Sequence, residues 1–227
     1  MRFSLFIAVL FVSWGSVAQK EVIDFDAVDS LYREDQFYFS LSFSNLQNTP
    51  AGFNQNKISA GISLGFLRDF PINKKRTWAI AAGLGYSYSG LNHNLGITEF
   101  EGENHYDIIT SEFDKNKLLL HYVDIPLEIR WRTSTPESHK FWRIYTGFKL
   151  SYLFHNQYKF NAGDIKVRQT DIPELNKLQY GTYLAVGWNT WNAYFYYGLN
   201  PIFKSANTET EQVKLNAFNI GLMFYIL

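Results

Sequence analysis

One stretch of the sequence resembles a catalytic serine motif. Gly61-Ile62-Ser63-Leu64-Gly65 matches G-x-S-x-G, the nucleophile elbow of serine hydrolases. That chemistry needs the serine on a strained turn between a strand and a helix. Here the alternation of small and large residues predicts one strand, with Gly61, Ser63 and Gly65 on the same face. We therefore expect no catalytic role for Ser63, and Gly83-x-Gly85 lies in a similar strand pattern without the helix that a dinucleotide site needs.

The histidines are the next residues that could do chemistry. They are scattered along the chain without a pair at metal-ligand spacing, and we expect them to be solvated surface residues. A barrel enzyme could place one of them at its outer rim as a general base, but nothing in the sequence selects one. The five are His93, His105, His121, His139 and His155.

Carboxylates gather in one predicted connection. Glu99, Glu101, Glu103, Asp107, Glu112 and Asp114 surround His105 there. Hard cations favour clustered oxygen ligands, but this spacing matches no EF-hand loop. We expect a solvated acidic segment, in which the aromatic residues between the charges form either a hairpin or a partner surface. We predict no catalytic residue, no cofactor-binding residue, no metal ligand and no cofactor.

Composition restricts the class of protein. The 227 residues are 46% hydrophobic and 18% aromatic, with a formal net charge of zero and no cysteine. A neutral chain is a poor nucleic-acid binder, because phosphate neutralisation needs a basic face. The mean hydropathy of −0.19 is too low for a bundle of membrane helices. The absence of cysteine excludes disulfides, thiolate metal sites and lipidation of an N-terminal cysteine.

The N-terminal segment has the pattern of an export signal. Arg2 supplies a positive charge, residues 3–12 are almost wholly apolar, and Ser16-Val17-Ala18 places small residues where a signal peptidase reads. We predict a signal peptide over residues 1–18, a periplasmic N-terminal segment over 19–35 and a β-barrel over 36–227. A short helix between 24 and 32 is the one helical pattern that we note.

The elements that position all these residues are predicted to be strands. Apolar residues alternate with small or polar residues, as strands with two different faces require. Each segment is near the ~10 residues with which a tilted strand crosses a bilayer. The sequence thus predicts an all-β, antiparallel up-and-down transmembrane barrel of about eight strands. The expected strands are 36–46, 58–69, 76–90, 117–132, 140–155, 178–189, 191–203 and 213–227.

The connections and the tryptophans indicate a membrane orientation. Short and long connections alternate, as they do between periplasmic turns and external loops of outer-membrane barrels. Both termini then lie on the periplasmic side of the cell outer membrane. The tryptophans after the signal peptide each lie near a short turn and on the apolar face of a strand, which predicts an interfacial girdle. They are Trp78, Trp131, Trp142, Trp188 and Trp191, and a second girdle is expected from Tyr86, Tyr88, Tyr152 and Phe154.

The face that points away from lipid carries charges. On the expected fourth strand these are Asp124, Glu128, Arg130 and Arg132, with Arg143 and Lys149 on the next strand. Charges on the lipid face would cost about 2–4 kcal/mol each near the midplane, so we place them in the lumen. We predict a lumen filled by an ion-pair network and small residues. His121 is an exception, because it has lipid-facing parity near the loop end of its strand.

Several stretches resemble a known family. They are Arg33-Glu34-Asp35-Gln36-Phe37-Tyr38, residues 65–74, residues 125–132 and Lys140-Phe141-Trp142-Arg143-Ile144-Tyr145. Over essentially the whole mature chain, the sequence resembles the PorT-like (porin-family) outer-membrane barrels of Bacteroidetes-type bacteria. The resemblance implies an accessory part in type IX secretion, and the family pattern contains no catalytic residues.

Four functions remain to be compared. The first is a non-enzymatic accessory or scaffold barrel in a secretion or assembly complex, with outer-membrane lipid and secretion-translocon proteins as partners and no nucleic acid. The second is a small porin-like passive channel or an adhesin-type barrel, although about eight strands leave room only for side chains. The third is an enzyme with its site at the rim. The fourth, a soluble lipocalin-like binder, would place large apolar residues inside the barrel.

Overall fold

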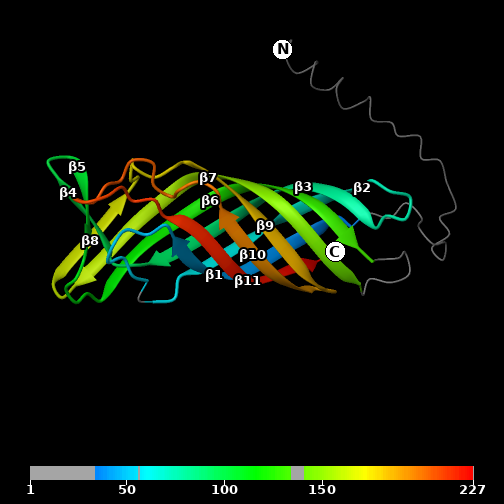
Figure 1. Ribbon diagram of the computed structural model, residues 1–227, viewed down its shortest axis with the longest axis horizontal. Helices are drawn as coiled ribbons and strands as arrows, with labels where there is room; N and C mark the ends of the chain where they lie inside the picture. Colours follow the sequence, from blue (N-terminus) through cyan, green and yellow to red (C-terminus); the bar gives the residue numbers. More distant parts are fainter. Residues whose placement is uncertain (1–33, 56, 134–140, 227) are drawn as a thin grey trace, which may run out of the picture. The chain divides into compact units, whose positions relative to one another are not determined.

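The computed structural model describes residues 34–55, 57–133 and 141–226 (Figure 1). The predicted signal peptide and the expected short helix lie outside the described residues. Eight long antiparallel strands dominate the described part. They are β1 (Gln36–Gln47), β2 (Ala60–Pro71), β3 (Trp78–Asn92), β6 (Lys115–Arg132), β7 (Trp142–Ala162), β9 (Leu178–Trp188), β10 (Trp191–Gly198) and β11 (Asn216–Ile226).

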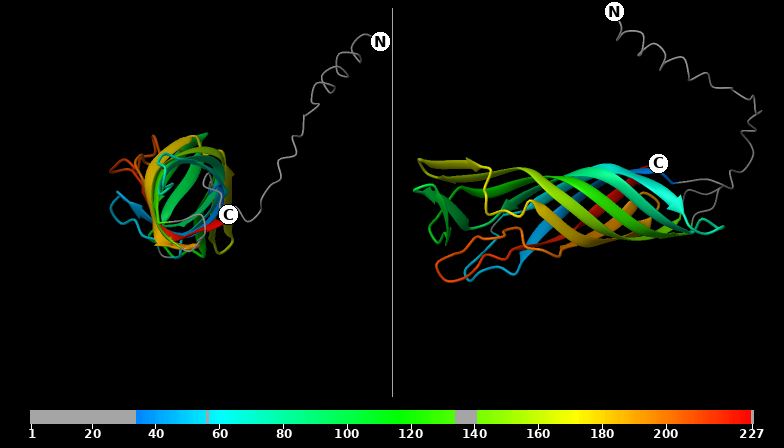
Figure 2. Two further views of the ribbon diagram at one scale, coloured as in Figure 1. Left: turned by 90° about the vertical axis from the view of Figure 1, so that its right-hand side faces the viewer. Right: turned by 90° about the horizontal axis from the view of Figure 1, so that it is seen from above.

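These strands close into a barrel, so the predicted fold class is confirmed. The eight strands are hydrogen-bonded side by side in the order β6-β3-β2-β1-β11-β10-β9-β7. A further pairing between β6 and β7 joins the two ends of this order and closes the ring. The first and last strands pair over eleven positions, from Phe37 opposite Ile226 to Gln47 opposite Asn216. The end-on view shows the strands surrounding one axis (Figure 2). Closure leaves none of the eight strands with an unpaired edge along the barrel wall.

One part of the wall extends beyond the others. β7 has 21 residues and continues to Ala162, where Gly163 (φ 56°) begins a turn into β8 (Ile165–Thr170). β8 pairs with the outer part of β7. The expected strands end at residue 155 and resume at residue 178, so the outer part of β7 and all of β8 were not predicted. The segment Ile165–Thr170 has only six residues, and most of them are polar. Its sequence therefore looks like that of a connection between strands.

The acidic segment folds as the hairpin that was one of its two predicted forms. β4 (Leu95–Phe100) pairs with β5 (Glu103–Ile108). The two residues between the strands, Glu101 (φ 54°) and Gly102 (φ 84°), both have positive φ, as a tight two-residue hairpin turn requires.

The predicted end of the seventh strand was wrong. The strand expected over 191–203 ends at Gly198. Both Ile202 and Phe203 are buried, whereas consecutive residues of a strand point to opposite faces. The chain instead turns inward after Gly198 and places both side chains in the interior.

The two faces of the wall differ as the sequence predicted. Leu84 and Ile129 on the outer face are 62% and 53% exposed, whereas Ala81 and Arg130 on the inner face are fully buried. The outer face is thus apolar and the inner face is small, polar or charged, as lipid on one side and packed side chains on the other require. Among the described residues, no helix is long and apolar enough to cross a membrane.

The tryptophans gather at one rim. Trp78 lies opposite Trp131, and Trp188 lies opposite both Trp142 and Trp191 in the strand register. This rim carries the short turns, residues 72–77 and 189–190, and we call it the turn end. The opposite end carries the long connections and the β4–β5 hairpin, and we call it the loop end (Figure 2).

Candidate functional site

The serine motif lies inside the barrel wall. Ser63 sits mid-strand between Ser40 on β1 and Ser87 on β3, and all three side chains are buried. A Cβ added at Gly65 or Gly85 would collide with the Tyr38 ring. The small residues of this motif therefore make room for a lumen tyrosine, and they do not form the strand–turn–helix of a nucleophile elbow.

The histidines lie in three different environments, and one of them corrects the prediction. His93 was expected at the surface, but it is buried against Phe53, and its Nδ1 accepts a hydrogen bond from the Leu95 N–H at 3.2 Å. Burial lowers the pKa of His93 to about 4, so the imidazole is neutral. The loop segments that fold over it could not be read from its neighbours in the sequence.

The remaining described histidines lie further out. His121 and His155 are cross-strand partners with ring centroids 5.3 Å apart, and Tyr86 Oη lies 2.7 Å from His121 Nδ1. His105 is exposed on the hairpin next to Phe100. His139 lies outside the described residues. His121 faces outward by the regular alternation of β6, as predicted, and a bulge at Phe154 of β7 puts both Phe154 and His155 on the same outer face.

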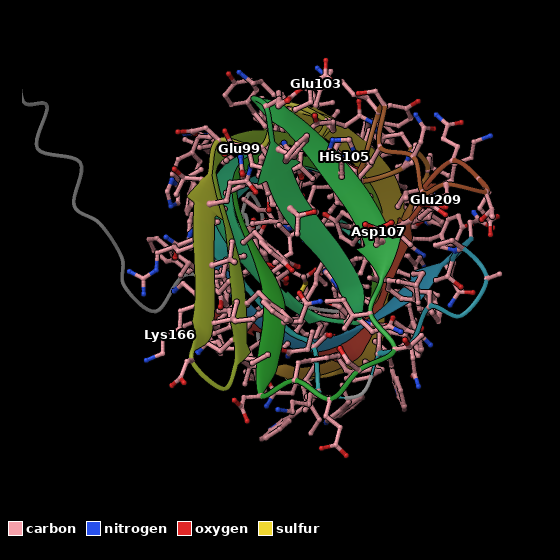
Figure 3. All side chains as sticks on the ribbon, turned by 90° about the vertical axis from the view of Figure 1, so that its left-hand side faces the viewer. Glu99, Glu103, His105, Asp107, Lys166 and Glu209 are labelled. Carbon is pink, nitrogen blue, oxygen red and sulfur yellow. The ribbon has the colours of Figure 1, made fainter. Side chains whose placement is uncertain are left out.

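The acidic hairpin covers the loop end. Figure 3 shows β4 and β5 lying across that end with Glu99, Glu103 and Asp107 on them. The hairpin is tied to the 171–177 connection because Asn104 Nδ2 and Tyr106 Oη each donate to Glu174 Oε2 at 2.8 Å. Burial and this carboxylate raise the pKa of Tyr106. Within the described part of the chain, no group of three or more His, Asp or Glu residues could hold a metal ion.

The charged residues predicted for the lumen form one buried network near the turn end. Arg130 donates to Asp69 at 2.9 Å and to Glu128 at 2.7 Å. Arg132 donates to both oxygens of Asp69, at 2.9 and 2.8 Å, so that this pair is bidentate. Asp69 thus bridges two guanidinium groups from successive inward-facing positions of β6.

Tyrosines complete the network. Tyr183 and Tyr225 donate their hydroxyl groups to Glu128 Oε1 at 2.8 and 2.9 Å. The guanidinium of Arg130 also lies over the rings of Tyr145 and Tyr225, at 4.9 and 5.8 Å from their centroids. Phenols thus supply both hydrogen bonds and apolar volume to a site from which water is excluded.

The predicted partners on the next strand behave differently. Lys149 pairs with Asp124 at 3.6 Å, as expected, and its ammonium also lies over the Tyr196 ring. Arg143 was expected to pair with a carboxylate, but it lies over the rings of Phe141 and Tyr225. Aromatic faces take the place of the expected ion pair there, because the carboxylates are already bonded to Arg130 and Arg132.

Sequence reasoning missed the tyrosines and two carboxylates of the network. Asp69 lies on the same strand face as Gly61, Ser63 and Gly65, and this parity could have revealed it. Glu34 precedes β1, yet it is buried, with Oε2 3.5 Å from Arg132 and its carbonyl accepting from Arg130 at 3.2 Å. Its position beside two lumen arginines follows from barrel closure, which alternation alone does not predict.

The interior near the loop end is apolar. Residues from the strand ends, the hairpin and the connections pack into one cluster there. Its fully buried members include Leu91, Leu95, Ile97, Leu118, Leu120, Tyr158, Leu175, Phe203, Ala206, Val213 and Leu215. We call this cluster the apolar plug. It was not predicted, because the Leu118-Leu119-Leu120 run hides the alternation of faces.

The plug and the charged network are separated by one small cavity. Its volume is about 50 Å³, and Ser63, Ser87, Ser151 and Lys149 are among its lining residues. A polar space of this size holds a few waters, which is too little for an organic substrate. Among the buried described residues, the four cations Arg130, Arg132, Arg143 and Lys149 balance the four carboxylates Glu34, Asp69, Asp124 and Glu128. The interior is therefore neutral and filled by side chains.

Comparison with known proteins identifies the family. A family model for the outer membrane protein beta-barrel domain matches residues 17–204. Neisserial surface protein A is 14% identical over 84% of this chain and 96% of its own, with a TM-score of 0.34. A mutant Rh. blastica porin is 9% identical over 86% of this chain and 100% of its own, with a TM-score of 0.21. No curated protein matches. From the family model, which spans most of the sequence, the chain belongs to the outer membrane protein β-barrel domain family.

Proposed function

We propose that this outer-membrane barrel is non-conducting and non-enzymatic, and that it acts as an accessory or scaffold component of a secretion or assembly complex. The observation that carries the proposal is the filled interior: ion pairs and tyrosines occupy the turn half, and the apolar plug occupies the loop half. A barrel filled in this way offers only its outer surfaces to other molecules. The resemblance to PorT-like barrels favours type IX secretion as the process.

The proposal includes an orientation. Short turns at one end and long connections at the other are typical of barrels with periplasmic turns and external loops. We place the turn end, with the ends of β1 and β11, in the periplasm and the β4–β5 hairpin outside the cell. Because the chain has no cysteine, single engineered cysteines report this directly. A membrane-impermeant maleimide on intact cells should label Glu101→Cys and leave Lys74→Cys unlabelled; the reverse pattern would invert the orientation.

The hairpin is the surface that we expect a protein partner to contact. Phe100 is 65% exposed at its tip, between Glu99 and Glu101. A full-length barrel with an affinity tag inserted after Thr208 would be purified from mildly solubilised outer membranes, and the bound proteins identified by mass spectrometry. We expect translocon proteins at stoichiometric yield. Recovery of the barrel alone would exclude a stable complex.

A matched pair of variants tests the contact itself. Phe100→Ser should reduce partner recovery, whereas Ile165→Ser, at the 62% exposed Ile165 on β8, should not. Equal recovery with both variants would exclude the hairpin tip as the contact, even if the complex exists.

Conductance separates this proposal from a small channel. The purified protein in planar lipid bilayers should produce no unitary current steps, because about eight strands leave an interior that side chains can fill. Reproducible steps would support the porin-like alternative. Recovery of partner proteins together with an absence of current steps would support the accessory role.

A further inference from the structure

The wall extension formed by β6, β7 and β8 has two chemically different faces. On the inner face, Asn116, Leu118 and Tyr158 are buried. On the outer face, Lys115, Lys166 and Arg168 are exposed, and Lys117 and Lys159 are half-buried. This outer face is the continuation of the face that meets lipid lower on β6, where Val123 and Ile125 point outward.

The strand register places these cations in two rows. Lys117 on β6 lies opposite Lys159 on β7, and Lys159 lies opposite Arg168 on β8. In the next row outward, Lys115 lies opposite Asn161, and Asn161 lies opposite Lys166. Directly opposed side chains in antiparallel strands have Cβ atoms about 4.5–5.5 Å apart, and like charges there are destabilising.

No carboxylate lies within ion-pair distance of these cations in the described part of the chain. Asp114 is adjacent to Lys115, but its Oδ2 accepts from the Gly163 N–H, and Asp164 lies at the tip of the β7–β8 turn. The acidic side chains of the hairpin lie across the barrel end, whereas Lys166 points away from it at the side (Figure 3).

The height of this basic face relative to the membrane follows from its neighbours. Immediately below it on the same face lies His121, whose ring is in contact with those of Tyr86, Tyr88, Phe154 and His155. Aromatic rings with polar edges lie at headgroup level. Lys117 extends over Gly90, where an added Cβ would meet Lys117 Cε at 2.7 Å and Tyr88 Oη at 2.9 Å. Its ammonium group is therefore beside the aromatic girdle.

We propose that the five cations Lys115, Lys117, Lys159, Lys166 and Arg168 form a binding face for the phosphate groups of a phosphorylated lipid in the outer leaflet. The face points sideways, toward neighbouring lipid, and it continues the lipid-facing side of the barrel through the aromatic girdle. Rows of opposed cations attract a multiply charged anion strongly at a surface of low dielectric constant. An acidic protein partner would be expected on a face that points away from the membrane. This inference rests on the proposed orientation but not on the identity of any protein partner.

The test measures binding of lipid to the purified full chain in a neutral detergent. The probe is lipid A carrying two phosphates, titrated at low salt, with the bound fraction read by native mass spectrometry. The variant Lys117→Gln/Lys159→Gln/Arg168→Gln removes one row. The matched control, Arg68→Gln/Lys74→Gln/Lys75→Gln, removes the same charges from exposed positions at the turn end.

We expect at least tenfold weaker binding for the row variant, no change for the control, and weak binding of the dephosphorylated lipid by all three proteins. The row variant should fold at least as well as the parent, since it relieves like-charge repulsion. Unchanged binding by the row variant, or equal binding of the dephosphorylated lipid, would overturn the proposal. Displacement of lipid A by an equal charge concentration of poly-aspartate would reassign the face to an acidic protein. A failure of the proposed function would instead appear in the pull-down and labelling experiments, which this titration does not use.

Discussion

In the half of the barrel nearest the short turns, the interior is held by ion pairs and by phenols bonded to a carboxylate, whereas in the half nearest the long connections it is a cluster of aliphatic and aromatic side chains without an ion pair among its members. The charged half is built almost entirely by the strands, whose register brings Asp69 and Arg130 together. The apolar half also needs the hairpin and the connections to fold inward. The contrast shows that one barrel can be filled by directional bonds at one end and by non-directional packing at the other.

The largest effect is expected from removing a cation in the charged half. Arg130→Met would leave Glu128 without its guanidinium partner in a dry interior, and losing one partner of a buried pair costs about 3–5 kcal/mol. Urea unfolding of the protein in phospholipid vesicles, followed by tryptophan fluorescence, would measure this loss. Arg68→Met is the control, because Arg68 is exposed near the turn rim and its loss should change stability by less than about 1 kcal/mol. A loss below about 1 kcal/mol for Arg130→Met would show that the network does not hold this half together.

A substitution that creates a cavity in the apolar plug should lower the free energy of unfolding by less, and its effect should be confined to the loop end. Leu118 is 1% exposed, and Leu118→Ala should cost about 3 kcal/mol through lost burial and the cavity left behind. Hydrogen exchange should accelerate in β4 and β5 while β10 stays protected. Leu119→Ala, on the outer face one residue away, should leave the hairpin protected. Equal acceleration throughout the barrel would mean that the two halves unfold as one unit.

Acid should weaken the apolar half through His93. Its pKa is about 4 in the folded protein, against an ordinary value of 6.5, so the folded state binds the proton less readily than the unfolded state. Above pH 6.5 the titration of His93 does not lower the free energy of unfolding. As the pH falls from 6.5 toward 4, the unfolded state binds the proton first, and the free energy of unfolding is lower by about 2 kcal/mol at pH 5. Hydrogen exchange at Leu95 between pH 8 and pH 5 would follow this loss.

Two variants assign that pH dependence. His93→Leu should remove it, whereas His105→Asn, at the exposed hairpin histidine, should retain it. If His93→Leu keeps the full pH dependence, the loop end must be opened by other titrating groups.

The smallest effect should come from a single phenol in the charged half. Tyr225→Phe removes one of the two hydroxyl donors to Glu128 Oε1 and should cost about 1.5 kcal/mol. Tyr183→Phe removes the other, and the double variant should deviate from additivity because both donors share one acceptor. Tyr197→Phe, on the outer face, is the control. Strict additivity in urea unfolding would mean that the two hydroxyl groups act independently.

Much of the wall could be predicted from the sequence, because a strand facing lipid and packed side chains alternates visibly. Alternation placed Glu128 and Arg130 inside and Trp142 outside, and it located the tryptophan rim. It does not give the height of a residue in the barrel or the register between distant strands. The partnership of Glu34 with Arg132 therefore could not be predicted, although Asp69 could have been found from its parity.

The loop end was harder to predict for a different physical reason. Leu118 and Leu120 face inward and Leu119 between them faces outward, yet all three residues are leucine. The residue types therefore do not show which side chains point into the barrel. His93 is buried by segments from Phe53 and Leu95, which the sequence shows only as connections. The basic face of β6, β7 and β8 likewise depends on pairing, since Lys117 and Arg168 are about 50 residues apart.

The pairing of β1 with β11 has a consequence for how the protein is made. Residues 36–47 can pair with β11 only after residues 216–226 have been synthesised. Closure of the ring therefore joins two segments that lie far apart in the sequence. Closing so long a loop is entropically slow, and contacts of this separation form late. Until that moment both edge strands expose unpaired backbone groups that invite association with other chains. The unfolded polypeptide must therefore be protected from aggregation before it reaches the membrane. The pairing of β1 with β11, which closes the barrel, is then a late step of folding in the membrane.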